Sequence, residues 1–227
     1  MRQIVYFPLF ALPLILQATA CQNSNHGNKK TETVTQKNQA PVQVNVQDGF
    51  AKAYFASGCF WCAEAIYESV KGVKEVYSGY SGGHTKNPTY QSSNTGHTGH
   101  AEAVEVVYDP TIVPFKTLVT VYFGSQNITQ TNGQGPDRGP QYRSIVFYQN
   151  EGQKETIENK IAELEKEVGA GNVAAEVLPF QKFWMGEAYH QNYERNNPNN
   201  PYIQNVSVPR LRRFQKKFPK LLKDGPH

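Results

Sequence analysis

The order in which strand patterns and helical patterns follow one another is the feature that most constrains the fold of this chain. Between residues 52 and 148, apolar residues alternate in some segments and recur on one helical face in others. These segments follow one another as strand, helix, strand, strand, helix and strand. That order is typical of the split β-α-β, or ferredoxin-like, arrangement. We therefore expect an α+β fold of this type, with an additional helix and strand and an irregular C-terminal tail.

The segment boundaries come from capping and turn residues. Strands are predicted over residues 52–56, 73–78, 101–108, 142–148 and 173–178. Helices are predicted to begin at Cys59, after Pro114, after Asn150 and at Ser207, and the last of these is basic and amphipathic as far as Leu221. Residues 79–100 and 124–140 are rich in glycine and small polar residues, so long loops are expected there, and such loops are often functional.

The first 48 residues have the composition of an export signal and a tether. Arg2 precedes an uncharged apolar run over residues 4–16, shorter than the roughly 20 residues that span a bilayer. The run leads to Ala18-Thr19-Ala20-Cys21, which resembles a bacterial lipoprotein cleavage box. We predict a signal peptide over residues 1–20 and lipidation at Cys21, with plain secretion as the alternative. The protein would then be exported and anchored through its lipid to a membrane of the bacterial cell envelope, on the periplasmic side.

Composition limits the remaining function classes. Residues 21–48 are too polar to form a core, so they are predicted to be a disordered tether before one folded domain over residues 49–227. The net charge of +4 is mild, and no interleaving of basic and aromatic residues suggests nucleic-acid binding. A disulfide scaffold needs several pairs of cysteines, whereas this chain has three cysteines, an odd number. Because two of them form a C-x-x-C pair, we interpret them as reactive thiols.

Cys59 stands where a thiol is expected to be activated. It follows a predicted strand and a glycine and begins a predicted helix, where the helix dipole favours the thiolate and should lower its pKa. A general dithiol–disulfide oxidoreductase would have the same feature. A metal-binding module is a further alternative, with His84, His97 or His100 as additional ligands. These histidines lack metal-ligand spacing, and the missing second cysteine pair excludes a four-thiolate zinc site. We therefore predict no metal.

Glu102 is the second unusual residue. It shares a strand face with Val104 and Val106, so its carboxyl group should point into the core. Burial raises the pKa of a carboxyl group, which makes Glu102 a candidate proton donor near neutral pH. The alternative is a carboxylate at the end of the sheet that reaches solvent, as we expect for Glu105.

Several motifs follow in a fixed order between residues 52 and 222. They are Gly58-Cys59-Phe60-Trp61, Gly79-Tyr80-Ser81-Gly82-Gly83, Asn87-Pro88-Thr89-Tyr90, Gly96-His97-Thr98-Gly99-His100-Ala101-Glu102-Ala103-Val104, Gln134-Gly135-Pro136-Asp137 with Gln141-Tyr142-Arg143-Ser144, and Tyr189-His190-Gln191-Asn192-Tyr193. Together they resemble the signature of the A class of peptide methionine sulfoxide reductases. The resemblance implies reduction of methionine S-sulfoxide, free or in proteins, and hence repair of oxidised proteins, with no cofactor.

The resemblance also implies roles for individual residues. The Cys59 thiolate would attack the sulfoxide sulfur while Glu102 protonates the oxygen. The other members of the site would be Phe60 and Trp61 around the S-methyl group, Tyr90, Tyr142 and Tyr202 around the oxygen, and Asp137 as a support. The pattern alone is also consistent with core packing of Phe60 and Trp61, and with ordinary buried, hydrogen-bonded tyrosines.

Recycling of the thiol is where this chain departs from many members of that family. Attack on a sulfoxide leaves a sulfenic acid, which condenses with a nearby thiol. Many relatives carry a recycling cysteine near the C-terminus, whereas here Ile203 follows Tyr202 and no cysteine occurs after Cys62. Cys62 is therefore the candidate resolving thiol, regenerated by a thioredoxin-like reductant. Alternatively, Cys62 only packs in the core and an external thiol does the recycling.

We expect a monomer. Residues 124–133 also differ from the His-Asp-Pro type of loop expected in the family.

Overall fold

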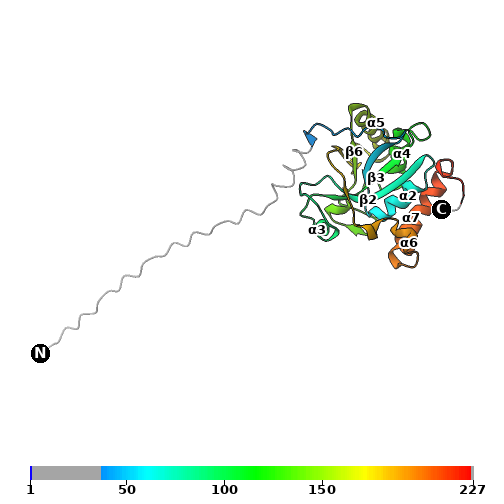
Figure 1. Ribbon diagram of the computed structural model, residues 1–227. Coiled ribbons are helices and arrows are strands. Elements are labelled where there is room, and N and C mark those ends of the chain that lie inside the picture. Colours follow the sequence, from blue (N-terminus) through cyan, green and yellow to red (C-terminus); the bar gives the residue numbers. More distant parts are fainter. Residues whose placement is uncertain (2–36, 226–227) are drawn as a thin grey trace.

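A six-stranded sheet forms the centre of the protein (Figure 1). The computed structural model describes Met1 and residues 37–225. The sheet order is β7-β6-β1-β3-β2-β8. The strands are β1 (Ala51–Ala56), β2 (Val73–Ser81), β3 (Ala101–Tyr108), β6 (Ile145–Tyr148), β7 (Glu176–Pro179) and β8 (Trp184–Met185).

The four central strands confirm the predicted topology. β6, β1, β3 and β2 are neighbours in that order and every pairing among them is antiparallel. The helix α2 (Phe60–Glu68) connects β1 to β2, and α4 (Phe115–Gly124) lies between β3 and β6. This is the ferredoxin-like arrangement. The additional helix is α5 (Glu151–Val168), capped by the Asn150 side chain, and the additional strand is β7, which pairs in parallel with β6.

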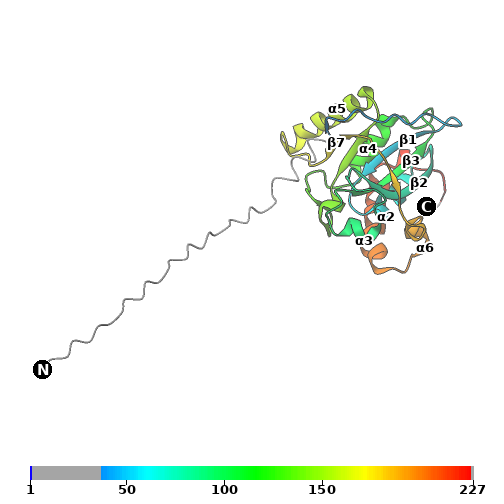
Figure 2. The same cartoon turned by 60° about the vertical axis from the view of Figure 1, so that its left-hand side comes forward.

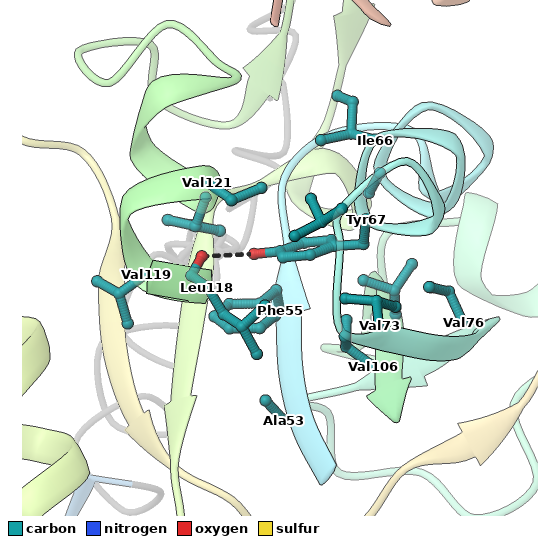
Figure 3. Packing of buried hydrophobic residues seen from close by; sticks show 14 of the residues in the cluster. Ala53, Phe55, Ile66, Tyr67, Val73, Val76, Val106, Leu118, Val119 and Val121 are labelled. Atoms are coloured by element: carbon teal, nitrogen blue, oxygen red, sulfur yellow. Dashed lines mark hydrogen bonds between the residues drawn. The ribbon is translucent and has the colours of Figure 1, made fainter. Parts of the chain in front are cut away.

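Helices α2, α4 and α5 pack on one face of the sheet and enclose the larger apolar core (Figures 1 and 2). Figure 3 shows Tyr67 of α2 reaching across to α4 beside Phe55 of β1, where the Tyr67 hydroxyl donates to the Leu118 carbonyl oxygen at 3.1 Å. Phe55 and Tyr67 stack at a centroid separation of 4.9 Å. The hydrogen bond joins the two crossover helices above the strand that leads into the cysteine pair.

The opposite face of the sheet is also covered, and this corrects one expectation. Glu105 was predicted to reach solvent, but it is only 7% exposed. Its carboxylate accepts hydrogen bonds from the Tyr54 hydroxyl and the Lys52 ammonium, both at 2.8 Å. The reason is tertiary: Phe180 stacks on Tyr54 at 3.7 Å, so the segment after β7 closes over this face.

The two predicted loops contain more regular structure than expected. β2 continues to Ser81, because its last residues pair with β3 on one side and, at Gly79 and Tyr80, with β8 on the other. A short helix, α3 (Tyr90–Asn94), begins at a capping box formed by Thr89 and Ser92. The second loop holds the hairpin of β4 (Gly133–Gln134) and β5 (Asp137–Arg138). A 3₁₀ turn, η1 (Pro140–Tyr142), follows it, so β6 begins three residues later than predicted.

The C-terminal tail returns across α2. It contains η2 (Ala188–His190), α6 (Tyr193–Asn196), the π-helical turn η3 (Ile203–Ser207), α7 (Val208–Lys217) and η4 (Pro219–Leu221). α7 packs against α2. It ends before the predicted limit because Pro219 has no N–H and disfavours helical geometry at the residue before it.

The predicted signal peptide and Cys21 lie outside the described residues. The last part of the predicted tether contacts the domain, since the Val42 amide donates to the Phe180 carbonyl and the Val44 amide to the Gln149 side chain, both at 2.8 Å. Over Met1 and residues 37–225, no helix is long and apolar enough to cross a membrane.

Candidate active site

Cys59 lies at the N-terminus of α2, immediately after β1 and a tight turn. Gly58 in this turn has a φ of +75°, a conformation that residues with a Cβ rarely adopt. A Cβ on Gly58 would lie 2.4 Å from the Cβ of Gln134. A glycine is therefore required for the chain to turn from the sheet into the helix with the Cys59 side chain at the helix start.

Glu102 on β3 points to the same helix start. Its side chain is buried at 2% exposure, and one carboxyl oxygen accepts the Phe60 backbone N–H at 3.0 Å. Burial raises the pKa of Glu102 to about 8, and the nearby charges of Asp137 and Cys62 act in the same direction. The hydrogen bond from Phe60 opposes this shift without cancelling it. The inward orientation predicted for Glu102 is confirmed, and its carboxyl group is mostly protonated at neutral pH.

The two free thiols differ in protonation in a way that the helix dipole did not predict. Burial raises the pKa of Cys59 well above its ordinary value, and its hydrogen bond to Cys62 adds to this. That hydrogen bond, together with the charge of Arg210, lowers the pKa of Cys62 to about 6 despite its burial. We had expected the lowered pKa at Cys59. The first N–H of α2 is instead taken by Glu102, and of the two thiols Cys62 is the one whose pKa is lowered.

Aromatic rings surround the start of α2. Phe60 is buried, and its ring lies 6.1 Å from that of Trp61 and 6.4 Å from that of Tyr90, which is nearly parallel to it. The edge of Tyr202 meets the Trp61 ring at 6.0 Å. Side chains from α2, α3 and the C-terminal tail thus form one apolar wall.

Hydroxyl groups lie beside this wall. The Tyr202 hydroxyl donates to a carboxylate oxygen of Asp137 at 2.6 Å and lies 3.7 Å from the Cys62 sulfur. The side chains of Tyr142 and Tyr90 interact electrostatically with each other. Burial, followed by the charge of Glu102, raises the pKa of Tyr142, so its hydroxyl remains a proton-bearing donor. The structure therefore brings together all the site residues that were predicted within the folded domain.

Two further aromatic residues belong to the wall and had no predicted role. The Trp61 ring stacks face to face on Tyr193 at 3.8 Å. Its indole N–H donates to Nδ1 of His190 at 3.1 Å. The buried His190 ring also lies 4.8 Å from Phe60 and 4.6 Å from Tyr90. Both residues occur in the Tyr189–Tyr193 motif, which was the only signal for them in the sequence.

Two carboxyl groups, the half-buried Glu187 and the buried Glu64, hold these segments in place. Glu187 accepts the Tyr90 backbone N–H and the Tyr80 hydroxyl, both at 2.8 Å. Glu64 on α2 accepts the Asn192 backbone N–H at 3.0 Å and the Ser78 hydroxyl at 3.2 Å. Burial raises the pKa of Glu64 to about 7. The His190–Tyr193 segment is thereby tied to the helix that carries the thiols.

The histidines of the Gly-rich loop have structural contacts. Nδ1 of His100 accepts the Gly83 backbone N–H at 3.1 Å, and Nε2 contacts the Thr85 carbonyl oxygen at 2.8 Å. Among the residues that the structure describes, no group of three or more His, Cys, Asp or Glu side chains is arranged to hold a metal ion.

The site combines a thiol pair with a protonated carboxyl group inside an aromatic wall. A soft sulfur nucleophile and a neutral acid next to each other suit attack at one atom of a polar bond and protonation at the other. The wall offers space to an apolar group, and aromatic rings make favourable contacts with sulfur.

Comparisons with known proteins give a consistent result. A family described as "Peptide methionine sulfoxide reductase" matches residues 51–222. The chain is 44% identical to the peptide methionine sulfoxide reductase MsrA of Pasteurella multocida over 172 residues, covering 76% of this chain and 98% of the relative. For the enzyme of the same name from Nautilia profundicola, identity is 46% over 165 residues, covering 73% and 94%.

Two solved structures resemble the fold. Methionine sulfoxide reductase A of Corynebacterium diphtheriae has a TM-score of 0.60 at 33% identity, covering 72% of this chain and 87% of that one. Mxr1 of Saccharomyces cerevisiae in its reduced form also has a TM-score of 0.60, at 28% identity, covering 69% and 91%.

Proposed function

Since the chain belongs to the peptide methionine sulfoxide reductase family and is thus an oxidoreductase acting on methionine S-sulfoxide, we propose that Cys59 is its nucleophile and Glu102 its acid. The observation that carries this proposal is the hydrogen bond from the Phe60 N–H to the buried Glu102 carboxyl. It brings a group that is protonated at neutral pH to the residue next to Cys59. Reduction of oxidised methionine in proteins is a repair reaction.

In the first step the oxygen of the sulfoxide passes to Cys59. The Cys59 proton moves to Cys62, which accepts its hydrogen bond, and the Cys59 sulfur then attacks the sulfoxide sulfur. Glu102 gives its proton to the oxygen as that oxygen gains negative charge. The products are methionine and a sulfenic acid on Cys59, so the substrate sulfur is reduced and the cysteine sulfur is oxidised.

The aromatic wall and the hydroxyl groups would orient the substrate for this attack. The S-methyl group would lie against Phe60 and Trp61, whose ring is fixed by Tyr193 and His190. The tyrosine hydroxyls of residues 90, 142 and 202 would surround the oxygen, with Asp137 holding that of Tyr202. Preorganised donors of this kind act on the charge that develops in the transition state.

In the second step Cys62 would resolve the sulfenic acid. The Cys62 sulfur forms a bond to the Cys59 sulfur, the bond between the Cys59 sulfur and oxygen breaks, and the oxygen leaves as water. The position of both thiols in the first turn of α2 supports this step, since bending is least costly at a helix end. A thioredoxin-like reductant would then regenerate both thiols by thiol–disulfide exchange.

The N-terminal sequence supports a proposal about location. Cleavage before Cys21 and lipidation of this residue would anchor the enzyme to a membrane of the bacterial cell envelope, with the domain on the periplasmic side.

The resolving role is tested by Cys62→Ser. One turnover of this variant should yield one equivalent of methionine and leave Cys59 as a sulfenic acid, trapped by dimedone and detected by mass spectrometry. Turnover driven by thioredoxin should fall steeply, because thioredoxin reduces disulfides. Turnover with a small thiol should persist at a reduced rate, because the variant also lacks the thiolate that accepts the Cys59 proton. Unchanged turnover with thioredoxin in this variant would mean that Cys62 only packs in the core.

A further inference from the structure

Arg210 on α7 is a buried cation whose contacts are all neutral. It is only 8% exposed. Its guanidinium donates to the Ser125 carbonyl oxygen and the Ser57 carbonyl oxygen, both at 2.9 Å, and to the Ser57 hydroxyl at 3.1 Å. Within the described part of the chain, it forms no ion pair with a carboxylate. A buried cation without a counter-ion is costly, so an anion is expected near Arg210.

Four groups that can become negative interact with the charge of this guanidinium: Cys62, Asp137 and the buried hydroxyls of Tyr67 and Tyr122. Burial raises the pKa of both tyrosines, so their hydroxyls stay neutral. Asp137 already accepts the Tyr202 hydroxyl at 2.6 Å, and burial raises its pKa. α7, which carries Arg210, packs against α2, and Cys62 and Arg210 both line one cavity of about 740 Å³. The Cys62 sulfur is therefore the anion best placed to accompany the guanidinium.

We propose that Arg210 is a positioning residue for the second step of the reaction, because its guanidinium favours the thiolate form of Cys62, which attacks the oxidised Cys59. This inference rests on the resolving role proposed for Cys62. In the attack Cys62 releases the proton that it took from Cys59 in the first step, and the bond between the two sulfurs forms. The bond between the Cys59 sulfur and oxygen breaks, and the departing hydroxide takes that proton to leave as water. Only the thiolate form of a cysteine is an effective nucleophile.

The electrostatic surroundings of Cys62 support this assignment. The hydrogen bond from the Cys59 thiol and the charge of Arg210 both lower the pKa of Cys62. The first of these contributions is lost when the Cys59 thiol is oxidised, whereas Arg210 remains in place. The other groups facing Cys62 are the Tyr202 hydroxyl, the Ser207 hydroxyl and Glu102. Cys59 and these three groups are neutral or acidic, so Arg210 is the one positively charged member of the set.

The chain offers a matched control for Arg210. Arg213 lies one helical turn further along α7 and lines the same cavity, but its side chain is exposed to solvent. Water screens the charge of an exposed side chain, so Arg213 should contribute little to the pKa of Cys62. Arg210→Gln removes the buried charge, and Arg210→Lys keeps it.

The test measures the pKa of Cys62 in a Cys59→Ser background, where Cys62 is the one thiol of the folded domain. Thiolate absorbance at 240 nm and the rate of iodoacetamide alkylation are followed against pH. Arg210→Gln should raise the pKa by at least one unit, which lowers the thiolate fraction about tenfold below the pKa. Arg210→Lys should keep the pKa of Cys62 close to its value in the background protein, and Arg213→Gln should leave this pKa unchanged. If Arg210→Gln does not fold, Cys62 in the background protein must still titrate below about 8.5, the ordinary value.

Several outcomes would overturn the inference. One is a pKa of Cys62 that is unaffected by Arg210→Gln, or an ordinary pKa in the background protein. Another is an equal rise in Arg210→Lys and Arg210→Gln, which would indicate loosened packing, as would a faster limiting alkylation rate at high pH. These titrations do not depend on turnover. A failure of the role inferred for Arg210 is therefore distinguishable from a failure of the resolving role proposed for Cys62. With both cysteines present, Arg210→Gln should keep one equivalent of methionine in the first turnover and form the disulfide about tenfold more slowly at neutral pH.

Discussion

Replacement of Glu102 by glutamine separates the chemical role of this residue from its place in the fold. Glutamine has the same shape, and its amide oxygen can still accept the Phe60 N–H that Glu102 accepts at 3.0 Å. An amide has no proton to give to the sulfoxide oxygen. We therefore expect Glu102→Gln to slow methionine formation in a single turnover by about 10²–10⁴-fold. Substrate affinity should change little, because the aromatic wall remains.

The same substitution should stabilise the protein at neutral pH. The pKa of Glu102 is raised by burial from 4.5 to about 8, so the folded protein keeps a proton that the unfolded chain releases. The resulting contribution to stability is complete below the unfolded pKa and is lost as the pH rises towards the folded pKa. Each pH unit in this window corresponds to about 1.4 kcal/mol. Relative to the wild type, the variant should gain roughly 2–3 kcal/mol of unfolding free energy between about pH 5 and about pH 7.

Two measurements check this prediction. Rapid-quench kinetics with a peptide containing methionine S-sulfoxide gives the single-turnover rate, and urea denaturation at both pH values gives the free energy of unfolding. Glu105→Gln is the matched control, because Glu105 lies on the same strand but on the opposite face, bonded to Tyr54 and Lys52. It should keep the single-turnover rate. A near wild-type rate in Glu102→Gln would refute its role as the acid, and parallel pH profiles of stability would refute its raised pKa.

Three further substitutions have sharp expected results. Cys59→Ser should abolish methionine sulfoxide reduction even with excess dithiothreitol, and activity above a few per cent of the wild type would contradict the nucleophile. Cys21→Ser should move the protein from the membrane fraction to the soluble exported fraction, whereas continued membrane association would indicate an uncleaved anchor. Gly58→Ala should destabilise the fold by roughly 2–5 kcal/mol in urea denaturation, because the added Cβ meets Gln134 at 2.4 Å in a strained conformation, and an unchanged midpoint would contradict this.

The apolar periodicity was enough to predict the central strands and both crossover helices. The strand predicted over residues 101–108 coincides with β3, and the predicted helix start at Cys59 coincides with the first turn of α2. These features depend on spacings of two and 3.6 residues, which are local properties of the chain. The inward direction of Glu102 followed for the same reason, because it shares its face with Val104.

Elements that depend on distant partners were missed. The end of β2 pairs both with β3 and with β8, which comes about one hundred residues later in the chain. The hairpin of β4 and β5 has no periodic pattern of its own. Glu105 lies on the opposite face of β3 from Glu102, as the alternation predicts. The segment around Phe180 nevertheless covers the face on which Glu105 lies. Alternation gives the face of a residue, but not whether another part of the chain covers this face.

The residue types of the candidate site were visible in the sequence through its motifs. Cys59 follows from its position at a helix start and Glu102 from its strand face, whereas the roles of the tyrosines follow from the family resemblance. His190 and Tyr193, which fix the Trp61 ring, had no predicted role because their function depends on contacts across more than one hundred residues. Arg210 was counted only as part of a basic C-terminal helix, since nothing local distinguishes it from its exposed neighbour Arg213.

The sequence by itself determined the order of helices and strands and the identity of the reacting groups, because both depend on local spacing and residue type. Only the tertiary structure decided where the protons reside. A helix N-terminus alone would lower the pKa of Cys59, but burial raises it, and the lowered pKa is that of Cys62. The pKa of a side chain depends on its desolvation and on charges brought near it, and here Glu102 and Arg210 come from strands and helices distant in sequence. Folding is what assembles these groups around the two thiols.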